Sequence, residues 1–387
     1  MAAEDSSMRR VRRSATLALA AFVTVSAALT MTSPGGSALS DLPDPPYSVP
    51  MGAMAAALSC TGPSPSAFEP VLLVHGTLAT PAENWGSNYG IVLPQLGYDT
   101  CTVALPMRAV GDIQVSAEYV VYAIRAMSAA YGRKVNILGH SQGPLEPRWA
   151  LQWWPSLRSQ VDHLVMMAAP NHGTIIANAL VACSPACLQM KVGSRFLAAL
   201  NAFDETPGPV SYTSIYSLTD ELVQPAFPEP TSAVAGATNI LMQDLCPGRV
   251  VEHVQFAFDA AVFAVVMDAF THPGMDADPA RIDRRVCTQT SFQGVDGNAG
   301  FRAVLSDWDT GWGNSGLAVN EPPLKPYVTA PQTATTIGVP LPTVTTAGPS
   351  PTTTPPTSTS AALAPMTTTS GTPANSAPTI GAAAPAW

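Results

Sequence analysis

A serine between two glycines marks the place where the chain most strongly indicates chemistry. Gly139-His140-Ser141-Gln142-Gly143 has the pattern G-x-S-x-G, and it lies between an apolar, strand-like run and a helical pattern. A turn this tight needs glycine on both sides, because side chains there would clash, and it lifts the serine oxygen above the edge of the sheet. Ser141 is therefore the predicted nucleophile of an acyl-transfer reaction.

A serine hydroxyl is unreactive at neutral pH, so Ser141 needs a histidine as base. On a sheet of this kind the catalytic residues follow in the order serine, acid, histidine, so the base must come late in the chain. His253 lies just past a Cys-Pro-Gly turn, where a loop would bring it over the sheet edge, whereas His272 precedes Pro273 in a polar, surface-like stretch. His253 is the predicted base.

The base in turn needs a carboxylate that fixes its tautomer and stabilises its protonated form. Asp220 directly follows the strand-like run Val210–Leu218, and the ends of strands are where such sheets present functional groups. Asp220 is the predicted acid, and Asp244 and Glu252 are the alternatives. A role for Asp220 as a turn or helix-capping residue is the competing interpretation.

Two hydrogen-bond donors must stabilise the oxyanion of the tetrahedral intermediate. The backbone N–H of Gln142 comes with the motif, and Thr77, in the His75-Gly76-Thr77 turn after an earlier strand, is the predicted second donor. His75 is expected to support that turn. His163 and His172 lack the partner spacing of a zinc site, so neither a metal nor a cofactor is expected.

The elements that position these residues alternate between apolar strands and helical patterns, which predicts a mostly parallel sheet with helices on both faces. The predicted strands are Pro70–His75, Thr100–Leu105, Val135–Gly139, Leu164–Ala169 and Val210–Leu218, and the predicted helices are Glu118–Tyr131 and Pro144–Trp154. Pro147 predicts a late start or a distorted first turn for the second helix.

At this point the chain resembles a known family. The segments that carry the resemblance are Leu-Leu-Val-His-Gly-Thr, Gly-His-Ser-Gln-Gly, Trp-Pro-Ser-Leu-Arg-Ser-Gln-Val-Asp, Ala-Pro-Asn-His-Gly-Thr, Ser-Leu-Thr-Asp-Glu-Leu-Val-Gln-Pro and Val-Glu-His. Together they are similar to secreted lipases of the α/β-hydrolase fold, particularly the Candida antarctica lipase B type and its bacterial relatives. The resemblance covers residues 60–327 and implies a mostly parallel central sheet flanked by helices.

Position by position, the resemblance implies the same roles that the residues suggest. Ser141 would be the nucleophile, Asp220 the acid and His253 the base, with Thr77 and Gln142 in the oxyanion hole. The resemblance further implies disulfides Cys60–Cys101 and Cys246–Cys287. Pairing neighbours in sequence within an exported chain adds Cys183–Cys187.

Two features depart from the family pattern. His140 stands where the Candida antarctica lipase B type has a tryptophan that shapes the alcohol pocket, so chiral preference does not carry over. Cys183-Ser-Pro-Ala-Cys187 precedes an apolar segment, Leu188–Leu200, that could form a helix near the site. This segment is either a small lid or a packed core helix, and both interpretations stay open.

The N-terminus predicts export. Arg9, Arg10, Arg12 and Arg13 precede an uncharged run, residues 14–31, and an Ala38-Leu39-Ser40 triplet suits signal peptidase. Residues 1–40 are therefore a predicted signal peptide, and a retained membrane anchor is the alternative, although Pro34 interrupts the run. Met8 is a candidate start, and the route is either general secretory or twin-arginine export.

Residues 41–327 form the predicted catalytic domain, and residues 328–387 a predicted disordered tail. The tail has no charged residue and is rich in Thr, Pro, Ser and Ala, so it has no apolar periodicity from which to build a core. It is either a stalk that contacts the cell wall or a passive extension. The net charge of −9 and the lack of a basic cluster beyond the N-terminus argue against nucleic acid as a partner.

These observations predict a secreted, monomeric serine lipase or esterase that hydrolyses neutral esters, such as acylglycerols, through an acyl-enzyme. Lipid or ester substrate is the expected partner, at a lipid–water interface where the substrate is insoluble. A polyesterase, a cell-envelope ester hydrolase or an acyltransferase would use the same residues. A non-catalytic surface adhesion module is the alternative from a different class, suggested by the stalk-like tail. An apolar acyl slot is expected from residues Leu78, Leu145, Leu188, Met190, Phe196 and Leu197.

Overall fold

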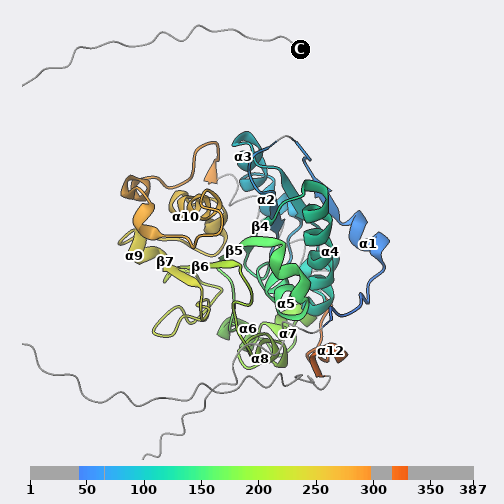
Figure 1. Cartoon of the computed structure of the whole chain (residues 1–387). Helices are drawn as coiled ribbons and strands as arrows, with labels where there is room; N and C mark the ends of the chain where they lie inside the picture. The colour runs from blue at the N-terminus through green and yellow to red at the C-terminus, as the bar shows by residue number, and fades with distance from the viewer. Residues whose placement is uncertain (1–42, 65, 298–315, 330–387) are drawn as a thin grey trace, which may run out of the picture. The chain divides into compact units, whose positions relative to one another are not determined.

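A β-sheet of seven strands organises the computed structural model of the chain, which describes residues 43–64, 66–297 and 316–329 (Figure 1). The strands lie in the order β1-β3-β2-β4-β5-β6-β7, and all neighbours pair in parallel except β1, which is antiparallel to β3. The strands are β1 Leu58–Cys60, β2 Val71–Val74, β3 Thr100–Val103, β4 Val135–His140, β5 Val161–Met167, β6 Ser211–Tyr216 and β7 Thr238–Leu241.

Helices occupy most of the connections between the parallel strands, whereas the described residues 217–237 join β6 to β7 without a helix. The larger ones are α3 Tyr89–Gln95, α4 Ile113–Tyr131, α5 Leu145–Trp153 and α10 Ala260–Phe270. The shorter ones are α1 Met51–Ala56, α2 Pro81–Trp85, α6 Ile175–Asn178, α7 Pro185–Gln189, α8 Arg195–Leu200, α9 Met242–Leu245 and α12 Pro326–Thr329. Five 3₁₀ turns complete the described part: Pro106–Ala109, Pro155–Ser159, Val254–Ala257, Pro279–Arg281 and Arg284–Thr288.

The core is divided by the sheet into two layers, and β2 shows why. Successive side chains of a strand point to opposite faces, so Leu72 and Val74 pack with α4 and α5, while Val71 and Leu73 pack with α3 and α10. All four residues of β2 are fully buried. A strand buried on both faces reads as a continuous apolar run, and burying each such side chain contributes about 1.5–3 kcal/mol.

The expected architecture, a mostly parallel sheet flanked by helices, is confirmed. All five predicted strands are present, although β5 begins at Val161 rather than Leu164. The helix expected from Glu118 begins at Ile113, because the Asp112 side chain accepts a hydrogen bond from Gln114 N (3.0 Å) and caps it. The edge strands β1 and β7 were not anticipated, since three and four residues carry too little pattern.

Pro147 does not distort α5. The helix begins at Leu145, so Pro147 is its third residue and lies in the first turn. Backbone N–H groups there have no acceptor within the helix, so a proline removes no hydrogen bond. The N–H of the next residue, Arg148, still donates to Pro144 O at 3.1 Å. The expected distortion was therefore wrong, because the proline stands too early to cause one.

The predicted signal peptide, residues 1–40, lies outside the described residues, and so does the predicted tail apart from Val328 and Thr329. These two residues end α12, and Val328 packs against the core together with Tyr327. The described residues belong to one unit, Met1–Ala334, and a second unit, Thr335–Trp387, is not described. No helix in the described ranges is long and apolar enough to cross a membrane.

Candidate active site

The Ser141 turn joins β4 to α5 at the carboxyl end of the sheet. Ser141 has a φ of +61°, which a residue with a side chain rarely adopts, and its N–H donates to Met167 O at 2.9 Å. A Cβ on Gly139 would lie 2.7 Å from Pro144 N, and one on Gly143 would lie 2.3 Å from Val74 O. Both flanking glycines are thus required by close backbone contacts, as the motif predicts.

The structure brings Ser141, His253 and Asp220 together. His253 Nε2 lies 2.8 Å from Ser141 Oγ, and His253 Nδ1 lies 3.0 Å and 3.1 Å from the two carboxylate oxygens of Asp220. His253 and Asp220 are buried, while the Ser141 side chain is partly exposed. This chain of contacts can take a proton from Ser141 Oγ and hold the charge that forms on the imidazole.

Asp220 is both a turn residue and the partner of His253. Its Oδ1 accepts hydrogen bonds from Leu222 N and Val223 N, each at 2.9 Å. The turn role weighed against the catalytic one is therefore also present. The next residue, Glu221, accepts a hydrogen bond from His253 N at 2.9 Å and fixes the histidine backbone. Glu221 has no motif of its own, and only its place beside Asp220 could have suggested it.

The electrostatics of this pair favour an ionised acid beside a basic imidazole. Burial alone would raise the pKa of Asp220, but the His253 ring and the two turn amides outweigh it and hold that pKa below its ordinary value. Burial alone would lower the pKa of His253, but the Asp220 carboxylate outweighs it and raises that pKa. The shifts have the signs expected of a carboxylate that stabilises an imidazolium.

The turn after β2 is held both by the His75 side chain and by contacts from neighbouring segments. His75 is fully buried, and its Nε2 accepts a hydrogen bond from Leu105 N (3.0 Å) while its Nδ1 lies 2.9 Å from Gly76 O. Gly76 N donates to Asn84 Oδ1 at 2.9 Å. Burial lowers the pKa of His75 to about 4, so the ring stays neutral and donates from Nδ1. His75 therefore has the supporting position expected of it.

Arg108 extends this support and was missed from the sequence. Leu78 N donates to Arg108 O (2.8 Å), and Arg108 Nε donates back to Leu78 O (2.8 Å). The guanidinium also pairs with both carboxylate oxygens of Glu83, at 3.0 Å and 2.6 Å. Glu83 belongs to the capping box Thr80-x-x-Glu83 at the start of α2, a sequence signal that could have located this helix.

Thr77 and Gln142 face each other across the site. Thr77 Oγ1 donates to Gln142 Oε1 at 2.6 Å. Within the described residues, neither the backbone N–H of Thr77 nor that of Gln142 has a hydrogen-bond acceptor. Two unused backbone donors beside a serine are the feature that an oxyanion hole requires.

His140 lies behind the site rather than in it. Only 5% of the residue is exposed, its Nε2 lies 2.9 Å from His253 O, and its Nδ1 lies 3.4 Å from Asn84 Oδ1. Burial, aided by repulsion from His253, lowers the pKa of His140 to about 3. The neutral ring therefore donates from Nε2 to the His253 carbonyl and links the two sides of the site.

The alternative acid and base candidates lie elsewhere. Asp244 and Glu252 are exposed. His272 follows α10, two residues after its last residue, and its Nδ1 lies 2.7 Å from Asp268 O. The two remaining histidines lie beside acids other than Asp220: His163 beside Asp162 and His172 beside Glu205. No cluster of three or more metal-ligating side chains occurs in the described part of the chain.

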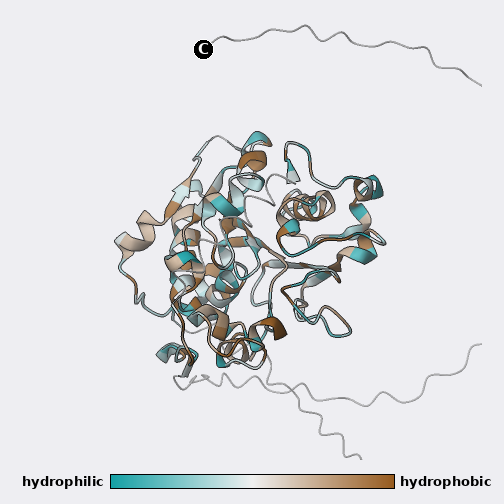
Figure 2. Cartoon of the chain, turned by 180° about the vertical axis from the view of Figure 1, so that it is seen from behind, coloured by the Kyte–Doolittle hydropathy of each residue, from teal (hydrophilic) through white to brown (hydrophobic). Residues whose placement is uncertain are grey.

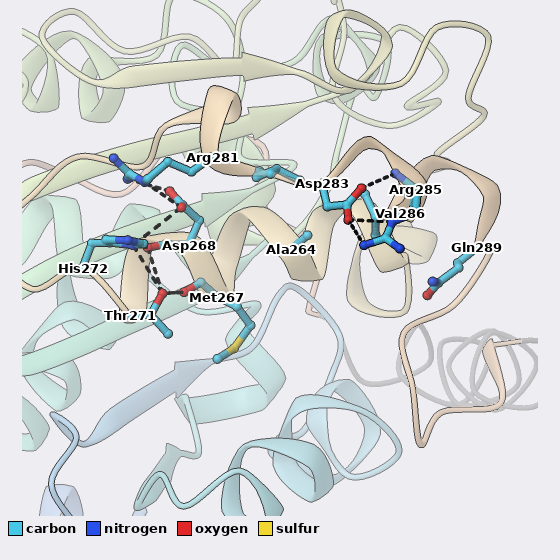
Figure 3. A pocket seen from close by; sticks show the side chains of 11 residues that line it. Ala264, Met267, Asp268, Thr271, His272, Arg281, Asp283, Arg285, Val286 and Gln289 are labelled. Atoms are coloured by element: carbon cyan, nitrogen blue, oxygen red, sulfur yellow. Dashed lines mark hydrogen bonds and ion pairs between the residues drawn. The ribbon is translucent and has the colours of Figure 1, made fainter. Parts of the chain in front are cut away.

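A cavity of about 620 Å³ lies at α10, and its lining does not include Ser141, Asp220 or His253 (Figure 3). Its polar walls are occupied by internal pairs, because Arg281 binds Asp268 at 2.7 Å and Arg285 binds Asp283. Paired charges leave little to attract a charged ligand.

The segment 188–200 does not form one helix: it contains the last two residues of α7 and the whole of α8. Met190, Phe196, Leu197 and Leu200 belong to the core, whereas Val192 is 43% exposed. Phe196 stacks on Trp149 with ring centroids 4.6 Å apart. Gln189 ties the segment to the start of α4, since its Oε1 accepts from Ile113 N at 2.8 Å and its Nε2 donates to Asp112 at 2.6 Å. This packing favours the core interpretation over the lid.

The six cysteines form three disulfides: Cys60–Cys101, Cys183–Cys187 and Cys246–Cys287. These are the expected pairs. Cys60 and Cys101 face each other on β1 and β3, so the first bridge fastens an edge strand to the sheet. Disulfides are typical of exported proteins, because the cytosol keeps thiols reduced.

Comparisons with known proteins agree with this geometry. Residues 68–254 match the family described as lipase (class 2). Lipase B of Pseudozyma antarctica is 37% identical over 219 residues, which cover 54% of this chain and 64% of that protein. The crystal structure of Aspergillus fumigatus lipase B superposes with a TM-score of 0.68 and 27% identity, covering 74% of this chain and 73% of the other. The chain resembles the class 2 lipases.

The match to the class 2 lipases contains the whole site, since residues 68–254 include Thr77, Ser141, Asp220 and His253. It ends before α10 and the cavity beside it. The match to Pseudozyma antarctica lipase B spans slightly less than two thirds of that protein. The resemblance predicted from the motifs is thus confirmed, and so is the α/β-hydrolase fold.

Proposed function

We propose that this chain is a secreted serine lipase or esterase that hydrolyses neutral carboxylic esters through an acyl-enzyme. The observation that carries the proposal is the contact chain from Ser141 Oγ through His253 to Asp220, with contacts of 2.8–3.1 Å. The similarity to lipases, which are carboxylic ester hydrolases, supports the same reaction class.

In the first half of the reaction, His253 Nε2 takes the proton of Ser141 Oγ as the oxygen attacks the ester carbonyl. The backbone N–H groups of Thr77 and Gln142 donate to the resulting oxyanion. His253 then gives its proton to the departing alcohol, which leaves the acyl group on Ser141. Asp220 stabilises the imidazolium in between and does not itself take the proton.

In the second half, water replaces the alcohol. His253 takes a proton from the water as it attacks the acyl carbon, and the same two N–H groups stabilise the second oxyanion. Collapse returns the proton to Ser141 Oγ and releases the acid. No step needs a metal or cofactor, because the oxyanion hole polarises the carbonyl and the imidazole moves the proton.

A lipid–water interface as the working surface is supported by exposed apolar residues next to the acid loop. Helix α6 is joined to that loop, because Ile175 N donates to Gln224 O (3.0 Å) and Thr174 Oγ1 donates to Leu222 O (2.6 Å). Figure 2 colours this short helix as strongly hydrophobic. Its neighbourhood exposes Ile175 by 52%, Ile176 by 42%, Val181 by 91% and Phe227 by 76%.

Secretion is part of the proposal, supported by the three disulfides and by the arginine-led apolar run near the N-terminus. The domain limits are proposed as predicted: a signal peptide at residues 1–40, a catalytic domain at 41–327 and a Pro/Thr/Ser-rich tail at 328–387. The catalytic domain is proposed to act as a monomer.

The test combines active-site labelling with a substrate profile. A serine-directed phosphonate should label Ser141 stoichiometrically and abolish hydrolysis of p-nitrophenyl esters, and Ser141→Ala should take no label. Activity should rise from acetyl to medium-chain esters, by up to about 0.8 kcal/mol for each buried methylene, and then level off. Labelling without hydrolysis, a strict acetyl preference or inactivation by chelator would each contradict the proposal.

Emulsified triglyceride and a solid polyester film, assayed in parallel, distinguish the lipase from a polyesterase. Addition of an alcohol acceptor distinguishes hydrolysis from acyl transfer by the ratio of acid to new ester. A surface adhesion module would neither hydrolyse esters nor react with the phosphonate.

A further inference from the structure

Glu146 is a buried carboxyl group that the mechanism above does not use. It is the second residue of α5, one turn after Ser141, and none of its surface is exposed. Its Oε1 accepts a hydrogen bond from Gln142 Nε2 at 2.7 Å, and its Oε2 has no partner among the described residues. Other buried acids, such as Asp162 and Asp259, are paired with a cationic side chain.

The Gln142 side chain connects Glu146 to Thr77 through two hydrogen bonds. Its amide has an oxygen at one end and an NH₂ group at the other, and the two ends have nearly the same size. The NH₂ group faces Glu146, and the oxygen accepts the Thr77 hydroxyl at 2.6 Å. Glu146, Gln142 and Thr77 therefore form a directed relay of hydrogen bonds that ends in the turn after β2.

An acceptor at Glu146 determines the direction of this relay. Glu146 Oε1 faces the amide and accepts from Gln142 Nε2. When the carboxyl group is neutral and its proton is on Oε2, Oε1 is a carbonyl oxygen that can only accept, so the NH₂ end of Gln142 forms the hydrogen bond there. Without that acceptor the amide is free to rotate, and an NH₂ group facing Thr77 would force the hydroxyl to accept instead of donate. The contact that holds Thr77 to Gln142 would then be lost or reversed.

The charge of Glu146 is consistent with this role. Burial raises the pKa of Glu146 to about 8, although the Gln142 hydrogen bond partly opposes the shift. The carboxyl group is therefore mainly neutral at pH 7, and it places little negative charge beside an oxyanion. A glutamine at the same position would keep both the shape and the acceptor.

We propose that Glu146 is a positioning residue of the oxyanion hole, which orients the Gln142 amide so that Gln142 holds the Thr77 turn beside Ser141. This inference rests on the proposed function, because it concerns the two residues whose N–H groups would stabilise the oxyanion. Glu146 touches neither the substrate nor the reacting atoms, and it acts through Gln142.

The test compares Glu146→Gln, which keeps an acceptor, with Glu146→Met, which keeps the chain length without one. Glu146→Met should lower kcat about 10- to 100-fold with KM changed less than about threefold, a smaller loss than the 10²–10³ expected on removing an oxyanion donor outright. Its affinity for a trifluoromethyl ketone, which forms a tetrahedral adduct with Ser141, should fall by the same factor. The single variant Glu146→Gln, which keeps an acceptor, should have a kcat within about threefold of wild type.

Glu118→Met is the matched control. Glu118 is also a buried glutamate, but it accepts hydrogen bonds from Ser48 N (2.6 Å) and Val49 N (2.9 Å) on the far side of α4. Its loss should lower the thermal midpoint and leave kcat per folded molecule unchanged. An equal loss of kcat in Glu118→Met and Glu146→Met would reduce the role of Glu146 to general stability and overturn the proposal.

A readout that needs no activity separates this inference from the proposed function. The ¹H–¹⁵N signals of Thr77 and Gln142 should shift in Glu146→Met and stay near their wild-type positions in Glu146→Gln. If these signals do not respond, positioning is wrong whether or not the wild type hydrolyses esters. If they respond in a wild type that hydrolyses no ester, the relay stands and the proposed function fails. Should Glu146→Met not fold, Glu146→Leu replaces it.

Discussion

Two histidine–aspartate pairs in the same half of the chain have different surroundings. His253 and Asp220 are both buried, and the histidine has a serine oxygen 2.8 Å from its other nitrogen. His272 lies 3.6 Å from Asp268, its side chain is 37% exposed, and it borders the cavity in Figure 3. The pairing of an imidazole with a carboxylate therefore does not by itself make a base.

Three differences separate the pairs. Asp220 offers both oxygens to its histidine, whereas both oxygens of Asp268 are bound by Arg281 at 2.7–2.8 Å. The Nδ1 of His272 is taken up by the Asp268 backbone carbonyl, at 2.7 Å. Finally, water screens an exposed pair, so the interaction there is weak. For a histidine–aspartate pair to act as a base, the pair must be buried, the carboxylate must be available to the imidazole, and a nucleophile must lie beside the other ring nitrogen.

The largest expected effect is the loss of turnover when Ser141 or His253 is replaced by alanine. Ser141→Ala and His253→Ala should each lower kcat by about 10⁴- to 10⁶-fold, and the double variant by little more, because the residues act as one unit. His272→Ala is the matched control and should change kcat less than about twofold. Steady-state ester hydrolysis measures all four. A large loss in His272→Ala would abolish the contrast between the pairs.

Replacing each aspartate by asparagine sharpens the comparison. Asp220→Asn should lower kcat about 10³- to 10⁴-fold. Asp268→Asn should leave kcat unchanged and lower the thermal midpoint, because Arg281 keeps only one of two accepting oxygens and loses the negative charge beside it. Kinetics and a thermal melt of both variants make the test. If Asp220→Asn is nearly harmless while Asp244→Asn is severe, the acid has been assigned wrongly.

The pH dependence follows from the direction of the His253 shift. The base acts only when it is neutral, so kcat/KM should rise with pH through the pKa of His253, which lies above the ordinary value of 6.5. In Asp220→Asn the carboxylate that raises this pKa is gone and burial remains, so the acidic limb should move to lower pH. An acidic limb that stays in place would show that Asp220 does not set the pKa.

His253 and His272 both lie in the stretch of chain closed by the disulfide Cys246–Cys287. Removing this disulfide should lower the free energy of unfolding by an intermediate amount. Cys246→Ala with Cys287→Ala opens a loop with a sequence separation of 41, which should cost about 4 kcal/mol of stability by loop entropy. Opening Cys183–Cys187, separated by 4, should cost about 2 kcal/mol. His253 has its own contacts to Asp220 and Glu221, so kcat per folded molecule should change little. Urea unfolding and kinetics at low urea test both statements.

The smallest expected effect comes from the C-terminus. A chain that ends at Thr329 should keep kcat and the thermal midpoint, because the residues after it are too polar to supply a packed face. Tyr327→Ala is the contrasting variant, since Tyr327 OH accepts a hydrogen bond from Trp149 Nε1 at 2.9 Å and its ring packs on the core. It should cost about 2 kcal/mol. A large loss on truncation would mean that the tail packs.

The residues of the proposed active site could be picked out from the sequence because each has a local signal, and the structure brings Ser141, His253 and Asp220 together. The glycines around Ser141 specify a turn, and the apolar run before Asp220 specifies a strand end. The residues that hold the loops of the site in place were not predictable. Arg108, Asn84 and Glu221 act through hydrogen bonds to segments that are distant in the chain. The helix at 260–270 was missed because its sequence is apolar almost throughout and shows no helical stripe.

Strand β1 has a consequence for how the molecule behaves at high concentration. A free sheet edge is a template on which a second chain can add a strand, and this is a common start of aggregation. Here the edge is only three residues long, and Cys60 is bonded to Cys101 on the neighbouring strand. Strand β1 therefore presents few free N–H and C=O groups. The disulfide also keeps β1 from separating from β3, so the edge of β3 stays covered. The disulfide Cys60–Cys101 should therefore oppose strand pairing between molecules, in addition to stabilising the fold.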